Sequence, residues 1–313
     1  MSTSVLPAPR RGWLAAAALV ALLAIGLVGA YRYVDNYWVY RGFAPPRDAA
    51  YVKVHGSAEH FTVASPALGG RRQLVEVYLP PGYRAHPSRQ YPALYLLHGF
   101  PGRPAAFLAT VRMGVVQDEL VALHRARPMI LVMPYGSTGS FTDKEWANGV
   151  RPHEAWETFL ARDVVHAIDT RYRTIRSGRG RAIAGLSEGG YAALNIAIHH
   201  PREFRVVESW SGYERADPVF SVFGHSVARL RHNSPQLTIT AAAHGLRQAH
   251  TSFWFYSGTG DRALKENSLF ARTLALLHLP YRYTVVHGGH NWAIWRGRAA
   301  LAYLAASKGL RHA

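Results

Sequence analysis

The chain has 313 residues, 49% of them hydrophobic, and a formal net charge of +17 at neutral pH. This length and apolar content allow one large core, so a single main domain is expected. The sequence has no internal repeat, Walker-type phosphate loop or His-Glu-x-x-His zinc pattern, and we expect neither a metal nor a cofactor. It also has no cysteine, which is compatible with export and with a reducing cytoplasm alike.

An uninterrupted apolar stretch from Gly12 to Ala30 follows Arg10 and Arg11 and ends before Arg32. As a helix, residues 13–30 would extend about 27 Å, close to the ~30 Å hydrocarbon core of a bilayer. Aromatic residues flank the stretch and are typical of membrane interfaces: Trp13, Tyr31, Tyr33 and Trp38. The pattern favours a transmembrane anchor.

A cleaved signal peptide is the alternative, because Val28-Gly29-Ala30 resembles a small-residue cleavage site. Either interpretation predicts a domain outside the cytoplasm, membrane-anchored in the first and secreted in the second. The arginines on both sides of the stretch do not decide its orientation. We therefore divide the chain into an anchor or signal segment (residues 1–31), a juxtamembrane linker (32–49) and a catalytic domain (50–313).

Strand-like and helix-like segments alternate from residue 50 onward, which predicts an α/β domain. We expect strands near Tyr51, Leu74 and Ala93, a helix that ends near His124, and a strand from Met129 to Met133. A helix from Trp156 to Asp169 is expected next, and further strand and helix pairs continue to the C-terminal helix, Trp292 to Leu304.

The segment RAIAGLSEGGY, residues 181–191, places Ser187 inside a Gly-x-Ser-x-Gly motif. An apolar strand precedes the motif and the helix Tyr191 to His199 follows it, so Ser187 is expected on a sharp strand-to-helix turn. Such a turn exposes a nucleophilic hydroxyl, and Gly185 and Gly189 leave room for the bend. The start of the helix then faces any oxyanion that forms.

α/β-Hydrolases carry their triad in the chain order Ser, Asp or Glu, His, and this chain offers partners in that order. Asp261 lies just past the strand TSFWFYS, where catalytic groups of open α/β sheets gather. Asp217 and Glu266 are its competitors.

His290 follows the strand from Tyr281 to Val286 on a glycine-flanked loop, and we assign it as the general base. His287 is the alternative, but its position next to the strand leaves it less freedom to reach Ser187. The acid would hold the imidazole in the correct tautomer without taking its proton.

An oxyanion hole requires two N–H donors, and one comes from the residue after the nucleophile, here Glu188. The second comes from the loop after the apolar strand in YPALYLLHGFPG, residues 91–102. Pro101 has no N–H, so Phe100 is our assignment and Gly102 the alternative. We expect His98 to order this loop rather than to take part in catalysis.

Four segments, LLHGFPG, GLSEGGYAAL, GTGD and GGHNW, together resemble the putative esterase family of α/β-hydrolases. That family includes esterase D, enterochelin esterases and antigen 85 mycolyltransferases. The resemblance covers roughly residues 50–305. It implies an α/β-hydrolase fold with a mostly parallel central sheet flanked by helices, with Ser187 as nucleophile, Asp261 as acid and His290 as base. Glu188 departs from the family pattern, in which many members carry an uncharged residue such as methionine.

Two further segments are expected near the active site. The loop Tyr135 to Pro152 lies on the predicted active-site face, and Asp143 and Trp146 within it are candidate substrate contacts, together with Trp292. Residues 217–248 are expected to cap the site after the sixth strand.

Five arginines cluster before the nucleophile strand: Arg171, Arg173, Arg176, Arg179 and Arg181. A basic domain beside a bilayer attracts anionic lipid, so an anionic membrane surface is a predicted partner. The alternative is that these arginines only form a solvated surface and bind no partner. No nucleic-acid partner is expected, because the usual binding motifs are absent. The sequence gives no indication of oligomeric state.

These features predict a membrane-tethered or exported serine esterase that acts on a small-molecule, lipid or sugar ester through an acyl-enzyme. Acyl transfer with the same triad is a second hypothesis, because the pocket and not the triad selects the acceptor. A non-catalytic module that binds envelope polymers or lipid through its basic surface is the third.

Overall fold

The computed structural model describes residues 11–33, 49–139 and 141–310. The chain forms two compact units, Met1–Pro45 and Pro46–Ala313, and each is considered by itself. Most of the linker predicted at 32–49, including Trp38, lies outside the described residues.

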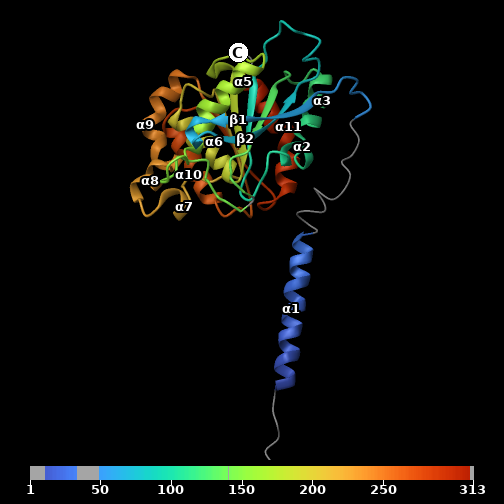
Figure 1. Cartoon of the computed structure of the whole chain (residues 1–313), viewed down its shortest axis with the longest axis vertical. Helices are drawn as coiled ribbons and strands as arrows, with labels where there is room; N and C mark the ends of the chain where they lie inside the picture. Colours follow the sequence, from blue (N-terminus) through green and yellow to red (C-terminus); the bar gives the residue numbers. More distant parts are fainter. Residues whose placement is uncertain (1–10, 34–48, 140, 311–313) are drawn as a thin grey trace, which may run out of the picture. The chain divides into compact units, whose positions relative to one another are not determined.

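The first unit contains one helix, α1 (Arg11–Tyr33), drawn in blue in Figure 1. Its segment Gly12–Tyr31 has a mean hydropathy of 2.4 and no buried side chains. This helix has the length and the composition of a membrane span, which signal sequences also have.

The second unit is built on an eight-stranded sheet with the order β1-β2-β4-β3-β5-β6-β7-β8. The strands are β1 (Ser57–Ser65), β2 (Arg71–Leu79), β3 (Ala93–Leu97), β4 (Ile130–Pro134), β5 (Arg181–Leu186), β6 (Val206–Trp210), β7 (Ser252–Gly258) and β8 (Tyr281–Val286). The first two strands pair antiparallel, β2 also pairs antiparallel with β4, and the others run parallel. The predicted mostly parallel α/β sheet is confirmed.

Helices cover both faces of this sheet (Figure 1). They are α2 (Ala106–Ala109), α3 (Met113–Ala122), α4 (Trp156–Thr158), α5 (Val165–Arg171), α6 (Glu188–His199), α7 (Phe220–Phe223), α8 (Val227–His232), α9 (Pro235–Gln248), α10 (Leu264–Leu276) and α11 (Trp292–Gly309). A π-helical turn, Phe159–Val164, joins α4 to α5, and short 3-10 turns occur at Pro66–Leu68 and Gly178–Gly180.

The central strands are buried on both faces because they alternate between two cores. In β3, Tyr95 packs into the core under α6, α9 and α10, whereas Leu94 and Leu96 pack into the core under α3 and α11. This explains the near-continuous apolar sequence of the strand, as expected for a parallel sheet covered on both sides.

Two sequence expectations were wrong. The first strand begins at Ser57, and Tyr51 lies in an exposed turn. The segment 217–248 is not one cap, because α9 belongs to the core and packs against α6 through Ile239, Ala243 and Leu246. Only residues 217–234, with the short helices α7 and α8, lie outside that core helix.

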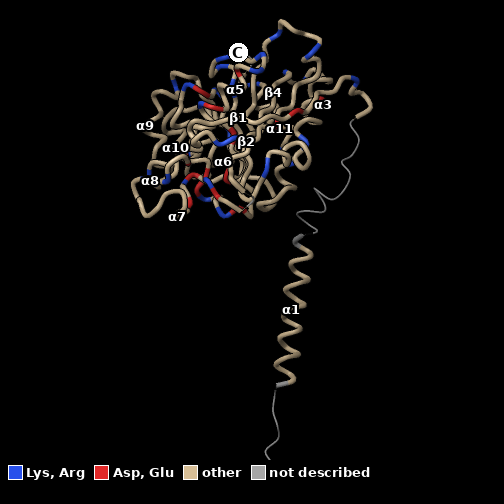
Figure 2. The backbone as a smooth tube through the Cα atoms, in the orientation of Figure 1, with Lys and Arg blue, Asp and Glu red and all other residues tan. Residues whose placement is uncertain are grey.

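The arginine cluster before β5 is largely engaged within the domain, although Lys and Arg are spread over the whole unit (Figure 2). Arg181 is buried and forms ion pairs with Asp169 at 2.5 Å and Glu203 at 2.7 Å. The Arg173 guanidinium lies 3.8 Å from the centroid of the Tyr83 ring. These two arginines therefore stabilise the fold and are not free to bind an anionic surface.

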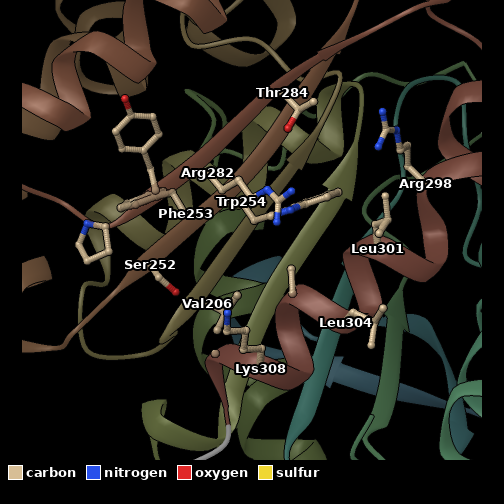
Figure 3. A pocket seen from close by; sticks show the side chains of 14 residues that line it. Val206, Ser252, Phe253, Trp254, Arg282, Thr284, Arg298, Leu301, Leu304 and Lys308 are labelled. Carbon is tan, nitrogen blue, oxygen red and sulfur yellow. The ribbon is translucent and has the colours of Figure 1, made fainter. Parts of the chain in front are cut away.

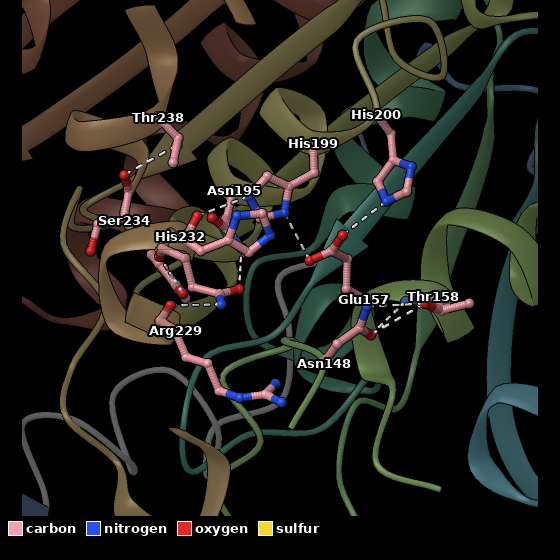
Figure 4. Close-up of polar contacts among 12 residues, drawn as sticks. Asn148, Glu157, Thr158, Asn195, His199, His200, Arg229, His232, Ser234 and Thr238 are labelled. Carbon is pink, nitrogen blue, oxygen red and sulfur yellow. Dashed lines mark hydrogen bonds and ion pairs between the residues drawn. The ribbon is translucent and has the colours of Figure 1, made fainter. Parts of the chain in front are cut away.

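A histidine cluster ties the end of α6 to neighbouring elements (Figure 4). The carboxylate of Glu157 on α4 is 2.9 Å from His199 Nδ1 and 2.9 Å from His200 Nε2. The ring of His199 stacks on that of His232 in α8, with centroids 4.4 Å apart. Burial raises the pKa of Glu157, but the two histidines outweigh it and lower that pKa to about 2. The same carboxylate overcomes burial to raise the pKa of His199.

Candidate active site

Ser187 occupies a strained turn between β5 and α6. Its φ of 57° and ψ of −124° lie outside the regions that a non-glycine residue normally adopts. The Ser187 N–H donates to the Trp210 carbonyl at 3.0 Å, which helps to hold the turn. This is the geometry of a nucleophile elbow, with the side chain lifted beyond the end of the sheet.

The flanking glycines are required by close backbone packing. A Cβ on Gly185 would lie 2.2 Å from the Gly189 carbonyl oxygen, and a Cβ on Gly189 would lie 1.9 Å from the Leu97 carbonyl oxygen. Neither space admits a side chain, so the helix approaches the sheet closely only because both positions are glycine.

A hydrogen-bonded chain links the three residues proposed for the triad. His290 Nε2 lies 2.7 Å from Ser187 Oγ, and His290 Nδ1 lies 2.9 Å from Asp261 Oδ1. Asp261 is buried, and its second oxygen accepts the Gly258 N–H. Burial raises the pKa of Asp261, but the His290 and Gly258 hydrogen bonds outweigh it and hold that pKa below its usual value. Asp261 is therefore a carboxylate that fixes the Nδ1–H tautomer of His290.

The competing residues lie elsewhere. His287 is exposed directly after β8. Asp217 pairs with Arg262 at 2.5 Å, and Glu266 lies in the first turn of α10. The structure thus brings Ser187, Asp261 and His290 together and leaves the alternatives outside the hydrogen-bonded chain.

The loop after β3 approaches the nucleophile at Gly99, where a Cβ would be 2.9 Å from both the Leu186 carbonyl oxygen and Ser187 Cβ. The next residue, Phe100, has an N–H without an acceptor among the described residues. Glu188 is the first residue of α6, so its N–H has no intrahelical acceptor either. Both N–H groups predicted as oxyanion donors are therefore without a backbone acceptor among the described residues.

The buried side chain of His98 holds this loop in place by hydrogen bonds. Burial lowers its pKa to about 4, so the ring is neutral. Its Nδ1 lies 2.9 Å from the Gly99 carbonyl oxygen, and its Nε2 accepts the Gly136 N–H at 3.1 Å. These bonds join the β3 loop to the loop after β4.

Trp146 is fully buried, and its Nε1–H donates to the His98 carbonyl at 3.1 Å. The indole packs against the His98 ring with centroids 5.1 Å apart. Trp146 therefore supports the β3 loop from the interior of the domain.

An acidic cluster that the sequence analysis did not identify lies beside the oxyanion donors. The buried carboxyl of Glu145 accepts the Tyr213 hydroxyl at 2.9 Å and 3.0 Å. Burial, followed by the charge of Asp143, raises the pKa of Glu145 well above its usual range. Burial and then the charges of Glu145 and Asp143 do the same to the pKa of Glu188. Burial and the neighbouring acidic groups thus disfavour the ionised form of Glu188, which lessens the conflict between a carboxylate and an oxyanion at this position.

A cavity of about 180 Å³ opens beside the triad. It is lined by Ser187, Ser211, Gly212, Tyr213, Asp261, Arg262, Ala263 and His290. None of the three predicted substrate contacts lines it. Besides the buried Trp146, Asp143 binds the Glu145 N–H at 2.9 Å, and Trp292 packs edge-on against Trp295 with centroids 5.1 Å apart. The ring of Trp295 in turn packs edge-on against His290 at 5.1 Å.

Tyr213 and Arg262 are among the lining residues that the sequence analysis did not identify. Arg262 directly follows Asp261, and Tyr213 follows the β6 terminus by three residues, so both stand at carboxyl ends of strands, where site residues gather. Their location after strand ends is the feature of the sequence from which both residues could have been predicted.

Comparisons with known proteins agree with this architecture. A model of the family described as "Putative esterase" matches residues 65–302. An esterase of Mycobacterium tuberculosis is 36% identical over 138 residues, which cover 44% of this chain and 28% of that protein. A diacylglycerol acyltransferase/mycolyltransferase of Mycobacterium leprae is 28% identical over 160 residues, or 49% of this chain and 43% of that protein.

Among solved structures, a ferulic acid esterase superposes with a TM-score of 0.72 at 24% identity, covering 82% of this chain and 100% of that one. At this identity the likeness establishes the fold. The chain spans about half or less of the length of the curated relatives it matches. Because the family model covers most of the catalytic unit, the chain belongs to the putative esterase family of α/β-hydrolases.

Proposed function

We propose that this chain is a serine-dependent carboxylic ester hydrolase that is membrane-tethered or exported. The observation that carries the proposal is the continuous hydrogen-bonded chain from Ser187 through His290 to Asp261. Family membership and the esterase among the relatives support the same class of reaction.

In this proposal each residue performs one step of the reaction. His290 Nε2 accepts the Ser187 proton while Oγ attacks the ester carbonyl, and Asp261 stabilises the resulting imidazolium. The N–H groups of Phe100 and Glu188 hold the oxyanion. The imidazolium then gives its proton to the departing alcohol, which leaves an acyl-serine that water hydrolyses with His290 again as base.

Acyl transfer is the second candidate, and the mycolyltransferase among the relatives favours it. The same acyl-serine would then be attacked by an alcohol in place of water, with no change in the triad. The helix α1 supports placement at a membrane or in a secreted form.

The test is hydrolysis of p-nitrophenyl acetate by the full-length chain in detergent, with Ser187→Ala and His290→Ala variants. His287→Ala is the matched control for the histidine, since it lies three residues away and outside the hydrogen-bonded chain. We expect the first two variants to lose turnover by about 10⁴-fold or more and the control to retain it. A folded wild-type chain without esterase activity would overturn the proposal in favour of a binding module. Adding glycerol as acceptor and measuring glyceryl acetate distinguishes transfer from hydrolysis.

A further inference from the structure

A second cavity, of about 550 Å³, lies far along the sheet from the triad. It includes the first residues of three parallel strands, Val206, Ser252 and Tyr281, whereas the triad follows the carboxyl ends of strands. The cavity therefore opens at the other end of the sheet. We call it the basic trough, for the three cations that line it, Arg282, Arg298 and Lys308.

The trough forms because α11 covers β6 and β7 but leaves the edge strand β8 open on this face. The helix is seated tightly at its end, where a Cβ on Gly309 would lie 2.4 Å from Val206 Cγ2. Beside it, Arg282 pairs in register with Trp254, so the two side chains share one face of the sheet. Figure 3 shows Trp254 and Arg282 opposite the side chains of α11.

The helix contributes both apolar and charged groups to the trough. Arg298, Leu301, Ala305 and Lys308 follow a spacing of three, four and three residues, which places them on one helical face. Ten residues separate the two cations, about 15 Å along the helix. Leu301 lies between them and is 47% exposed. The floor is thus an exposed apolar strip with a cation near each end.

The three cations lack a neutralising partner among the described residues. None of Arg282, Arg298 and Lys308 forms an ion pair within the described part of the chain, and no carboxylate lines the trough. A neutral apolar occupant would remove water from these charges without replacing it, which is unfavourable. An occupant that fits must therefore carry an anionic group and an apolar part.

We propose that the basic trough binds an anionic lipid, with an acyl chain along Trp254, Leu301 and Leu304 and its headgroup at a cation that borders this apolar strip. An acidic peptide fits less well. Its backbone N–H and C=O groups would need partners along their whole length, and the aliphatic hydroxyls that line the trough are those of Ser252 and Thr284. An acyl chain has no such groups. The volume is within the usual range of ligand sites, ~300–1,000 Å³.

The apolar helix α1 gives this proposal its setting. This helix has the length and composition of a membrane span, and basic residues close to a bilayer are attracted to its anionic lipids. The trough contains no triad residue, so lipid binding there is independent of ester hydrolysis.

The test uses the full-length chain in phosphatidylcholine nanodiscs that contain a trace of diazirine-labelled phosphatidylglycerol or, in parallel, diazirine-labelled phosphatidylcholine. After photolysis, labelled peptides are mapped by mass spectrometry. We expect labelling of residues 298–309 and 252–254 to be at least about fivefold stronger with the anionic lipid, which corresponds to the ~1 kcal/mol expected from a single well-placed basic residue. Equal labelling by the two lipids, or label confined to α1, would overturn the proposal.

Two variants separate charge from shape. The double variant Arg282→Glu/Lys308→Glu should reduce trough labelling to the phosphatidylcholine level, and Ala305→Trp should reduce it by filling the trough without changing charge. The matched control, Arg84→Glu/Arg272→Glu, reverses two exposed arginines outside the trough and should label like the wild type. If the control loses label as strongly as the trough variant, general charge and not the trough binds lipid. Unchanged turnover of p-nitrophenyl acetate shows that each variant is folded.

Discussion

The raised pKa of Glu188 leads to a quantitative prediction for Glu188→Gln. Burial and the neighbouring carboxyls raise the pKa of this side chain. We predict from this direction that the wild-type acid is uncharged at neutral pH. Glutamine has nearly the same shape and is also uncharged. We therefore expect kcat/KM at neutral pH to change by less than about threefold.

The difference is expected at higher pH. As pH rises through the raised pKa of Glu188, the wild-type side chain ionises close to an oxyanion held at its own N–H, at a separation that we take as ~6 Å for a Coulomb estimate. At an effective dielectric constant of ~20, the repulsion is about 2.8 kcal/mol, or roughly 100-fold in rate. The wild type should lose activity along this alkaline limb, and the glutamine variant should lose much less.

The assay is kcat/KM for p-nitrophenyl acetate from about pH 5 to about pH 10, corrected for spontaneous hydrolysis. Glu119→Gln, on α3, is the matched control and should follow the wild-type profile. A glutamine variant that gains about 100-fold at neutral pH would show that Glu188 is ionised there, and this would refute the reasoning. Superimposable wild-type and variant profiles would refute it as well.

Three further predictions concern the acid, the elbow and the histidine cluster. Asp261→Asn reverses the tautomer of the base and should reduce kcat by about 10⁴-fold in the same assay, and a loss below tenfold would contradict the assignment. Gly189→Ala forces its Cβ to 1.9 Å from the Leu97 carbonyl oxygen, so thermal unfolding should show destabilisation by about 3 kcal/mol or more; an unchanged midpoint would show that the turn adapts. The pKa of Glu157 is lowered from its usual value of 4.5 to about 2, and this shift contributes about 3 kcal/mol to the free energy of unfolding. The contribution is fully present above pH 4.5 and is lost as the pH falls through about 2. The pKa of His199 is raised above its usual value of 6.5, so this histidine adds stability that is fully present below pH 6.5. That stability is lost as the pH rises through the raised pKa. The free energy of unfolding of Glu157→Gln, measured with urea, should show neither of these changes with pH. A pH profile of stability like that of the wild type would contradict the role of the cluster.

The sequence predicted the backbone around the triad well because its signals are local. The glycines around Ser187 require a specific turn, and the strand ends that carry Asp261 and His290 can be recognised from short apolar runs followed by glycine. The order of the three residues along the chain then limits how the strands can be arranged.

The substrate contacts could not be predicted in the same way, because the direction of a side chain depends on packing between distant segments. Trp146 lies on the expected loop, yet its indole turns inward to His98, 48 residues earlier in the sequence. Tyr213 reaches the site by its bond to Glu145, 68 residues away. No local pattern encodes either contact.

Charge was equally difficult to interpret from composition. Arg181 belongs to a cluster that suggested a free basic surface, but burial and two ion pairs commit it to the fold. Arg282 and Lys308 are 26 residues apart in sequence and drew no attention there, yet both line the basic trough. Which cations remain unpaired is a property of the tertiary structure.

The central claim is that Ser187 is a nucleophile activated by His290. Its most direct test is intact-mass and peptide analysis of the full-length chain after reaction with a fluorophosphonate, for the wild type, Ser187→Ala and His290→Ala. We predict one adduct, on Ser187, in the wild type, none in the serine variant, and labelling slowed by at least about 100-fold in the histidine variant. A folded wild type that remains unlabelled, or that carries the adduct on another residue, would contradict the account.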